Sequence, residues 1–178
     1  MSNKIKAFLI GIGFISIFST PAFGQYYFGG EVGFLEYSED GFSQEPSLTA
    51  LAGVLGMDFN ENFSGEIRVG FGIGDDTITA GGISADIELD NYFGAYLKGG
   101  IPVSEQFFPY VTIGYTRGEL SASAFGLSIS ESESDVSFGI GFDYDFTSSI
   151  SGSVEYMNYL DKDGAEISGF SIGITRAF

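Results

Sequence analysis

Carboxylates dominate the charged side chains of this sequence, so the chemistry open to it is largely that of anionic oxygen groups. Its 178 residues include 24 Asp and Glu against 7 Lys and Arg, and they contain no His and no Cys. A serine-hydrolase triad needs a His base, and structural zinc sites need Cys or His ligands, so both kinds of site are excluded. Disulfide bonds are excluded because the sequence has no Cys. The net charge of −17 argues against nucleic acid as a partner, because phosphate backbones bind basic surfaces.

Clustered carboxylates could bind hard divalent cations, which take several oxygen ligands. The run 161–164 (DKDG) resembles the start of a calcium loop, but the later ligands of such a loop are missing. We therefore expect at most weak divalent-cation binding in the acidic loops, and a solvated surface is the simpler interpretation. No cofactor is expected. The glycines in 70–74 (GFGIG) recur at every second residue, whereas a dinucleotide fingerprint opens a helix with GxGxxG.

Five charged residues lie at alternating positions within otherwise apolar or small-residue segments. They are Glu31, Glu66, Arg68, Lys98 and Glu155. If the apolar face of each segment is turned to lipid, these five side chains point into the interior of a barrel, where a charge is costly unless paired. We favour a static plug in which these groups satisfy one another. The alternative is a gate in which Arg68 and Lys98 exchange carboxylate partners.

The segments that must position these charges are predicted to be β-strands. Apolar and small or acidic residues alternate with period two, most clearly in 136–146, where apolar side chains occupy every even position. Ala85, Ile87 and Leu89 are placed on the same face as Phe93. Eight strands are expected, at about 26–37, 48–59, 63–74, 85–101, 107–118, 136–146, 150–160 and 165–178.

The connections between these strands alternate in length. Short turns are expected at 60–62, 103–106 and 147–149, and long polar loops at 38–47, 75–84 and 119–130. A tight hairpin at 161–164 completes the set. Short turns on one side and longer loops on the other are typical of a transmembrane β-barrel. An even number of strands places both ends of the barrel on the side of the short turns.

The choice of outward face depends on which side chains fit a narrow interior. The second face of each strand is mainly Gly, Ser and Ala, and the chain contains 27 Gly. Small residues suit the interior of an eight-stranded barrel, which leaves little open lumen. Aromatic residues gather near strand ends, as in the girdles of membrane barrels. A soluble lipocalin-like barrel, with its apolar face inside, is the alternative.

The first 24 residues have the pattern of a secretory signal peptide. Lys4 and Lys6 precede the apolar run 7–18, which is shorter than the ~20 residues of a membrane-spanning helix. Small residues at Ala22 and Gly24 predict cleavage before Gln25. The expected organisation is a cleaved signal peptide (1–24) followed by a single β-barrel domain (25–178).

Three segments give a more specific resemblance. GIGFDYDF (139–146), SGSVEYMNYL (151–160) and GFSIGITRAF (169–178) resemble the last three strands of the OmpA-like and OmpX-like eight-stranded outer-membrane barrels of Gram-negative bacteria. The resemblance implies an all-β, antiparallel up-and-down transmembrane β-barrel with both termini in the periplasm. It also implies a lumenal charge network and recognition by the barrel assembly machinery. Arg176 departs from the apolar residue usual at its position. The assembly signal comprises Phe178, Ile174, Ile172 and Phe170.

These observations lead to one preferred function and two alternatives. We expect a small, monomeric, non-enzymatic protein of the outer membrane, in contact with lipid and lipopolysaccharide, with a structural or surface-interaction role for its acidic loops. No peptidoglycan-binding domain is expected after the barrel. The first alternative is a narrow, cation-preferring pore or small-ligand conduit gated by the lumenal charges. The second is the soluble lipocalin-like binder. A lipid-modifying enzyme is disfavoured because such barrels use His with Ser.

Overall fold

The computed structural model describes residues 24–39, 46–80, 83–125, 127–162 and 164–178, and within them the regular elements are all strands. Every strand pairing is antiparallel, which confirms the all-β prediction. None of these residues forms a helix with the length and hydropathy needed to cross a bilayer. The strands are β1 (Tyr26–Glu39), β2 (Ser47–Asp58), β3 (Phe63–Gly72), β4 (Asp75–Ala80), β5 (Ile83–Gly100), β6 (Phe107–Ala124), β7 (Leu127–Thr147), β8 (Ile150–Lys162) and β9 (Ala165–Ala177).

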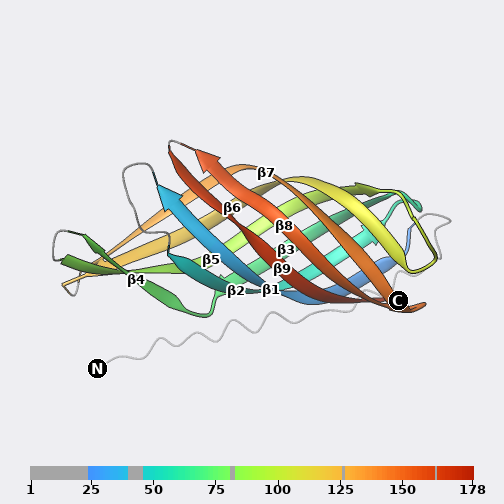
Figure 1. Ribbon diagram of the computed structural model, residues 1–178, viewed down its shortest axis with the longest axis horizontal. Helices are drawn as coiled ribbons and strands as arrows, with labels where there is room; N and C mark the ends of the chain where they lie inside the picture. Colours follow the sequence, from blue (N-terminus) through green and yellow to red (C-terminus); the bar gives the residue numbers. More distant parts are fainter. Residues whose placement is uncertain (1–23, 40–45, 81–82, 126, 163) are drawn as a thin grey trace, which may run out of the picture.

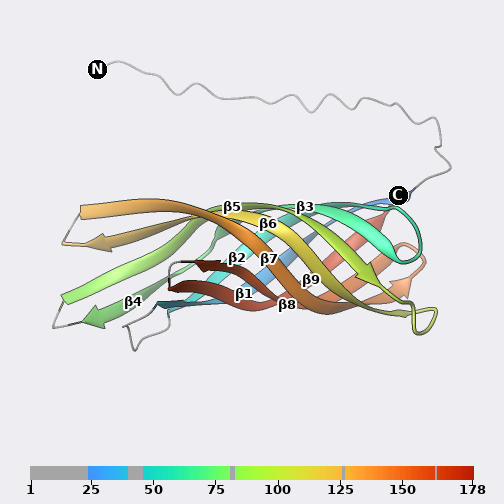
Figure 2. The same ribbon diagram turned by 90° about the horizontal axis from the view of Figure 1, so that it is seen from above.

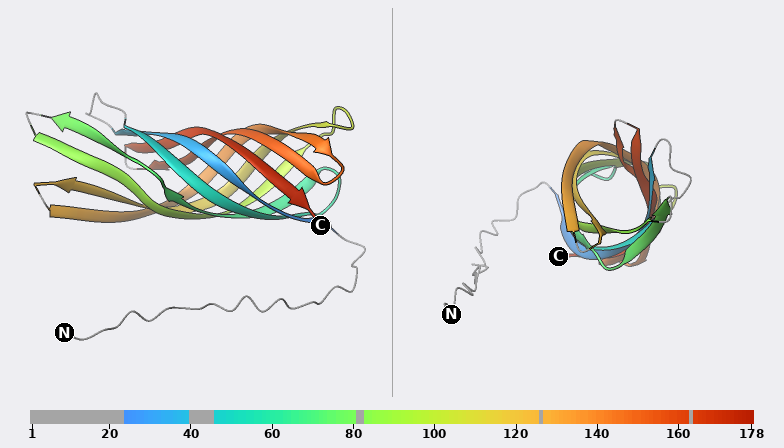
Figure 3. Two further views of the ribbon diagram at one scale, coloured as in Figure 1. Left: turned by 90° about the horizontal axis from the view of Figure 1, so that it is seen from below. Right: turned by 90° about the vertical axis from the view of Figure 1, so that its left-hand side faces the viewer.

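The strands close into a ring, seen end-on in the right panel of Figure 3. The sheet runs β3-β2-β1-β9-β8-β7-β6-β5-β4, and a further pairing between β3 and β5 closes it. β3 pairs with the later part of β5, and the short β4 pairs with the first part of β5. β3 and β4 therefore lie end to end and together occupy a single strand position in the ring. The ring is therefore an eight-stranded up-and-down barrel, as predicted.

The two ends of the barrel differ in how far their strands extend along the barrel axis (Figures 1 and 2). The end that carries the short turns and the C-terminus, here called the turn end, is compact. At the other end, the hairpin end, the β4–β5 and β6–β7 hairpins project beyond their neighbours. The prediction of long polar loops at 75–84 and 119–130 was therefore wrong. Most residues of both segments are paired in strands. The strands continue beyond the apolar belt with polar residues, which can pair through their backbones without contact to lipid or to a core.

The outer wall of the barrel is an apolar belt. Val69, Phe138 and Ile172 are 57–58% exposed, and large apolar side chains point outward at alternate positions of β1, β2, β3, β5, β6, β7 and β9. A water-soluble barrel would bury such a continuous surface, whereas a bilayer covers it. The apolar face is therefore on the outside, as a membrane barrel requires and as a lipocalin-like barrel does not.

The interior of the hairpin-end half is filled by an apolar layer. Two of its members, Leu48 and Met157, are 1% and 0% exposed. Tyrosine rings fit here because the facing residues are glycines: a Cβ on Gly70 would lie 2.2 Å from Tyr92 Cε1, and one on Gly114 would lie 2.3 Å from Tyr96 Cδ1. The apolar layer comprises Leu35, Leu48, Ala50, Ala52, Leu89, Tyr92, Tyr96, Met157, Tyr159, Leu160 and Ile167.

Two register shifts alter which residues enter this layer. One lies between Leu89 and Asn91 in β5, and the other between Asn158 and Leu160 in β8. The first places Leu89 inside, 3% exposed, and Phe93 outside, 51% exposed. The predicted common face of 85–89 with Phe93 was therefore wrong, because a bulge changes the side to which the next residues point.

Some predictions concern residues outside those described. Residues 1–23, which make up nearly all of the predicted signal peptide, are among them, and so are 40–45 and Asp163. The signal peptide therefore stays a prediction. In the hairpin expected at 161–164, Lys162 is paired with Ala165, and Gly164 adopts a φ of +86° that favours glycine.

Candidate functional site in the barrel interior

Arg68 of β3 is the centre of a buried ion cluster. Its Nη2 donates to Glu66 Oε2 at 2.6 Å, and its Nη1 donates to Glu155 Oε1 of β8 at 2.5 Å. Glu31 Oε2 of β1 lies 3.7 Å from the same Nη1. All four residues occupy inward positions of their strands and are nearly fully buried. Three strands that are distant in sequence thus contribute carboxylates to one guanidinium.

Lys98 of β5 extends the cluster toward the turn end. Its Nζ lies 3.2 Å from Glu66 Oε1 and donates to Asp143 Oδ2 of β7 at 2.9 Å. It also lies 3.9 Å from the centroid of the Tyr110 ring, a cation–π geometry. Asp143 was not among the residues singled out from the sequence. It shares the inward register of Gly139 and Gly141, and that shared register is the signal that could have identified it.

Neutral hydroxyl groups complete the coordination of the three glutamates. Tyr27 donates to Glu66 at 2.8 Å, Tyr92 donates to Glu31 at 3.1 Å, and Thr112 donates to Glu155 at 2.8 Å. The guanidinium also lies over the Tyr96 ring, 4.7 Å from its centroid. Each buried glutamate therefore has a cation and a hydroxyl donor nearby, which is what a buried polar network needs to be stable. We call Glu31, Glu66, Arg68, Lys98, Asp143 and Glu155 the charge network.

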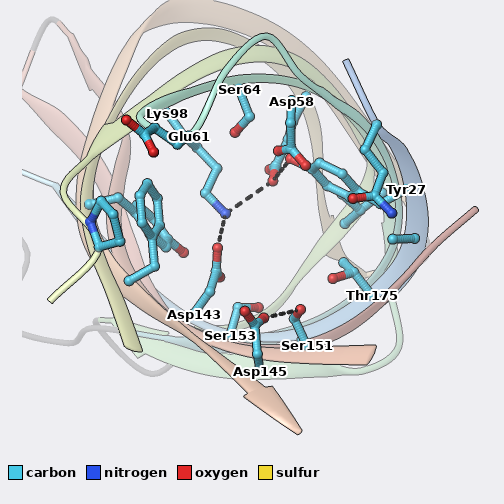
Figure 4. A pocket seen from close by; sticks show the side chains of 18 of the residues that line it. Tyr27, Asp58, Glu61, Ser64, Lys98, Asp143, Asp145, Ser151, Ser153 and Thr175 are labelled. Atoms are coloured by element: carbon cyan, nitrogen blue, oxygen red, sulfur yellow. Dashed lines mark hydrogen bonds and ion pairs between the residues drawn. The ribbon is translucent and has the colours of Figure 1, made fainter. Parts of the chain in front are cut away.

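A cavity of about 560 Å³ lies between the charge network and the turn end. Figure 4 shows Lys98 reaching toward Asp143, with Asp58, Asp145 and Thr175 around the same space. The Asp145 carboxylate accepts a hydrogen bond from Ser151 at 2.5 Å. This turn-end cavity has a mixed lining of polar and apolar side chains, and all six residues of the charge network form part of it.

A second cavity, of about 430 Å³, lies at the hairpin end. It shares no lining residue with the turn-end cavity, and the apolar layer lies between them. On its rim Lys162 donates to Glu133 at 2.7 Å. This exposed hydrogen bond lowers the pKa of Glu133. The two cavities are therefore separate spaces at opposite ends of the barrel.

The residues of the expected assembly signal all point outward from β9 and the chain end. Phe170, Ile172, Ile174 and Phe178 are each exposed on the apolar belt. The Phe178 ring lies 6.2 Å from that of Tyr26. Recognition of these residues by an assembly machinery stays a prediction.

Metal binding has no structural candidate among the residues described here. No group of three or more acidic side chains in this part of the chain is arranged to hold an ion. The weak divalent-cation site expected at 161–164 includes Asp163, which is outside the described residues. That expectation stays a prediction.

Comparison with known proteins places this geometry in a wider context. The family model described as outer membrane protein beta-barrel domain matches residues 8–178. Among solved structures, Ail, the attachment invasion locus protein of Yersinia pestis, is 17% identical with a TM-score of 0.63, over 87% of this chain and 99% of that one. Ail in complex with the heparin analogue sucrose octasulfate gives 17% identity and a TM-score of 0.61 over the same shares. Neisserial surface protein A is 12% identical with a TM-score of 0.62, over 86% of this chain and 97% of that one. No curated protein matches.

Proposed function

We propose, from the premise that the chain belongs to the outer membrane protein beta-barrel domain family, that it is a closed barrel whose acidic hairpin end binds a basic partner at the cell surface. The protein lies in the outer membrane and is not an enzyme. In such barrels the short turns face the periplasm, so the hairpin end faces outward. Lipid then covers the apolar belt of a single barrel, and we propose that the protein acts as a monomer.

The observation that carries the proposal is the charge of the projecting hairpins. Carboxylates greatly outnumber cations on them, and Lys162, at the neighbouring end of β8, is already paired with Glu133. An excess of one sign of charge attracts partners of the opposite sign and accelerates their encounter. The acidic residues of this region include Asp76, Asp86, Glu119, Glu131, Glu133 and Asp135.

The edges of the projecting sheet support an interaction role. β8 pairs with β7 only as far as Phe138, so within the described residues 128–136 of β7 have no strand on that side. β4 is the last strand at its end of the sheet and is paired there with β5. Such edges present free backbone N–H and C=O groups, to which an extended segment of a partner can add.

The same charge argues against a polyanionic ligand. The structure of Ail was solved with sucrose octasulfate, a heparin analogue. A sulfated ligand would meet mainly carboxylates on the projecting hairpins of the present chain, where only Arg117 and Lys162 among the residues of β4–β8 at this end carry positive charge. We therefore propose that this chain binds a different class of partner.

The closed interior supports a static barrel over the pore or conduit. Ions moving along the lumen would have to cross the apolar layer, in which Leu48 and Met157 are fully buried. The glutamates of the charge network are satisfied by cations and hydroxyl donors together, which favours a fixed structure over exchange of partners.

The test compares a polycation with a polyanion. The barrel is placed in nanodiscs of zwitterionic lipid, and binding of poly-lysine and of heparin is measured by surface plasmon resonance at low and high salt. We expect poly-lysine to bind, more weakly as salt rises, and heparin not to bind. Reversal of charge by Glu131→Lys with Glu133→Lys is expected to weaken poly-lysine binding by about tenfold or more.

The matched control reverses two charges on the periplasmic turns, with Glu61→Lys and Glu105→Lys. This variant has the same net charge as the first but an unchanged hairpin end, so its affinity for poly-lysine is expected to stay near that of the parent. Equal losses in the two variants, or heparin binding stronger than poly-lysine binding, would contradict the proposal.

A further inference from the structure

The cavity at the hairpin end is a groove with an apolar floor. Leu160 and Ile167, both members of the apolar layer, form part of its lining. Ile87 and Leu120 line it from the projecting sheet and pack against the same layer. The groove thus presents apolar side chains on two sides and opens toward the outside of the cell.

One wall of this groove stands in water rather than in lipid. Ile129 of β7 lines it and is 75% exposed. Val136, on the same strand, belongs to the apolar belt. At roughly 3.3 Å per residue, Ile129 lies about 23 Å farther along the strand. The bilayer therefore does not cover this side chain, and apolar surface left in water marks a site for a partner.

The rim of the groove is acidic. Glu39, Glu131 and Glu133 line it together with Lys162. Lys162 is hydrogen-bonded to Glu133, and Tyr37 donates to Glu39 at 2.9 Å. Glu39 and Glu131 form no ion pair with a cation among the described residues. The rim thus has negative charge available to a ligand directly above the apolar floor.

From the apolar floor and the acidic rim, we infer that the groove binds an extended basic peptide segment of another protein, with one apolar side chain inserted beside Leu120 and Ile129 and flanking Lys or Arg side chains at Glu39 and Glu131. This inference rests on the proposed function and adds the place and the chemical pattern of recognition. The free edge of β7 forms one side of the groove, so a segment lying there can hydrogen-bond to backbone and insert alternate side chains.

Charge selects this occupant over the others that an apolar groove admits. A second copy of the chain would bring its own acidic rim against Glu39 and Glu131, and like charges repel. An acyl chain would fill the apolar floor but leave the carboxylates without a counter-charge. A segment of this chain adjoining Pro46, such as 40–45, carries Asp40 and Glu45 and has no basic residue.

The experiment measures binding of a defined peptide to the barrel in zwitterionic nanodiscs. The probe is a fluorescein-labelled synthetic peptide in which lysines flank a single leucine, and the readout is fluorescence anisotropy. Leu120→Ser removes apolar contact from the groove and is expected to weaken binding about tenfold. Glu131→Gln removes one rim charge and is expected to weaken it roughly threefold, less at high salt.

Matched controls change the same kinds of side chain outside the groove. Phe125→Ser alters an exposed apolar residue at the tip of the β6–β7 hairpin, and Glu88→Gln removes an exposed carboxylate from β5. Neither residue lines the groove, so both variants are expected to bind the peptide within about twofold of the parent. Heat-dependent migration on gels verifies that every variant is folded.

Each other outcome overturns the inference in a recognisable way. If Leu120→Ser binds the peptide as the parent does, or if a peptide with serine in place of leucine binds equally well, the groove is not the binding site. Binding would then be due to the acidic surface alone. Equal binding of a peptide with glutamates in place of lysines points to an apolar ligand such as an acyl chain. If no basic peptide and no poly-lysine binds, the proposed function fails together with the inference.

Discussion

Replacing Arg68 with methionine is the most direct test of how the interior is stabilised. The side chain keeps much of its length and its apolar contact, but the guanidinium is lost. Glu66 keeps Lys98 and Tyr27 as partners. Glu31 and Glu155 keep only the hydroxyl donors Tyr92 and Thr112 among the contacts described above. The variant therefore leaves two buried carboxylates without a cation.

The size of the effect follows from the burial of these groups. Removing one partner of a buried ion pair costs about 3–5 kcal/mol, because the remaining charge is left desolvated. The turn-end cavity lets water approach the network from one side, so we expect the free energy of unfolding to fall by about 3 kcal/mol, the lower end of that range. Adding Glu31→Gln and Glu155→Gln removes the unpaired charges and is expected to restore most of the loss.

Urea-induced unfolding in lipid vesicles measures the difference. Circular dichroism reports the loss of strand, and tyrosine fluorescence reports the interior, since the chain has no Trp. Arg68→Lys serves as the control that keeps a positive charge. A loss below about 1 kcal/mol in Arg68→Met would refute the argument, as that is the range of exposed pairs. A triple variant (Arg68→Met with Glu31→Gln and Glu155→Gln) that is less stable than Arg68→Met alone would also refute it.

Three further predictions follow from other parts of the structure. Gly114→Ala places a Cβ against the Tyr96 ring and is expected to cost about 1–3 kcal/mol in the same unfolding assay. In planar bilayers the parent barrel is expected to be silent, whereas Met157→Ser, which puts a short polar side chain into the apolar layer, is expected to admit measurable ion leakage; a conducting parent would contradict this. Lys162→Met is expected to raise the pKa of Glu133 toward its ordinary value in an NMR titration. Because the pair holds that pKa low, its stabilisation is present above the ordinary Glu pKa and is lost as the pH falls through the lowered one.

The inward position of the central charges could be predicted from the sequence alone. Glu66 and Arg68 lie in the regular alternation of one strand, and no bulge separates them from its apolar residues. The same holds for Glu31 in β1. What alternation does not contain is the pairing across the lumen. The contact of Lys98 with Asp143 depends on side-chain reach between strands, so Asp143 remained one small or acidic position among several.

The inward position of Leu89 and Leu160 in the apolar layer was not predicted, for a physical reason. Leu89 and Leu160 enter it next to bulges, and a bulge depends on which backbone groups a neighbouring strand leaves unpaired. A single strand's pattern does not contain that information.

The projecting hairpins were missed because polar residues were interpreted as loop. A strand exposed to water on both faces needs only backbone pairing, and polarity alone does not distinguish it from an irregular segment.

The charge network also has a consequence for how the barrel is built. Its members come from β1, β3, β5, β7 and β8, and Arg68 and Glu155 are 87 residues apart in the chain. Contacts of such sequence separation form only after the intervening strands have been added. A half-inserted sheet thus carries ionised groups on its inner side and keeps them hydrated. Joining β1 to β9 closes the barrel and brings those groups together, so formation of the seam between the first and last strands is also the step that completes the charge network.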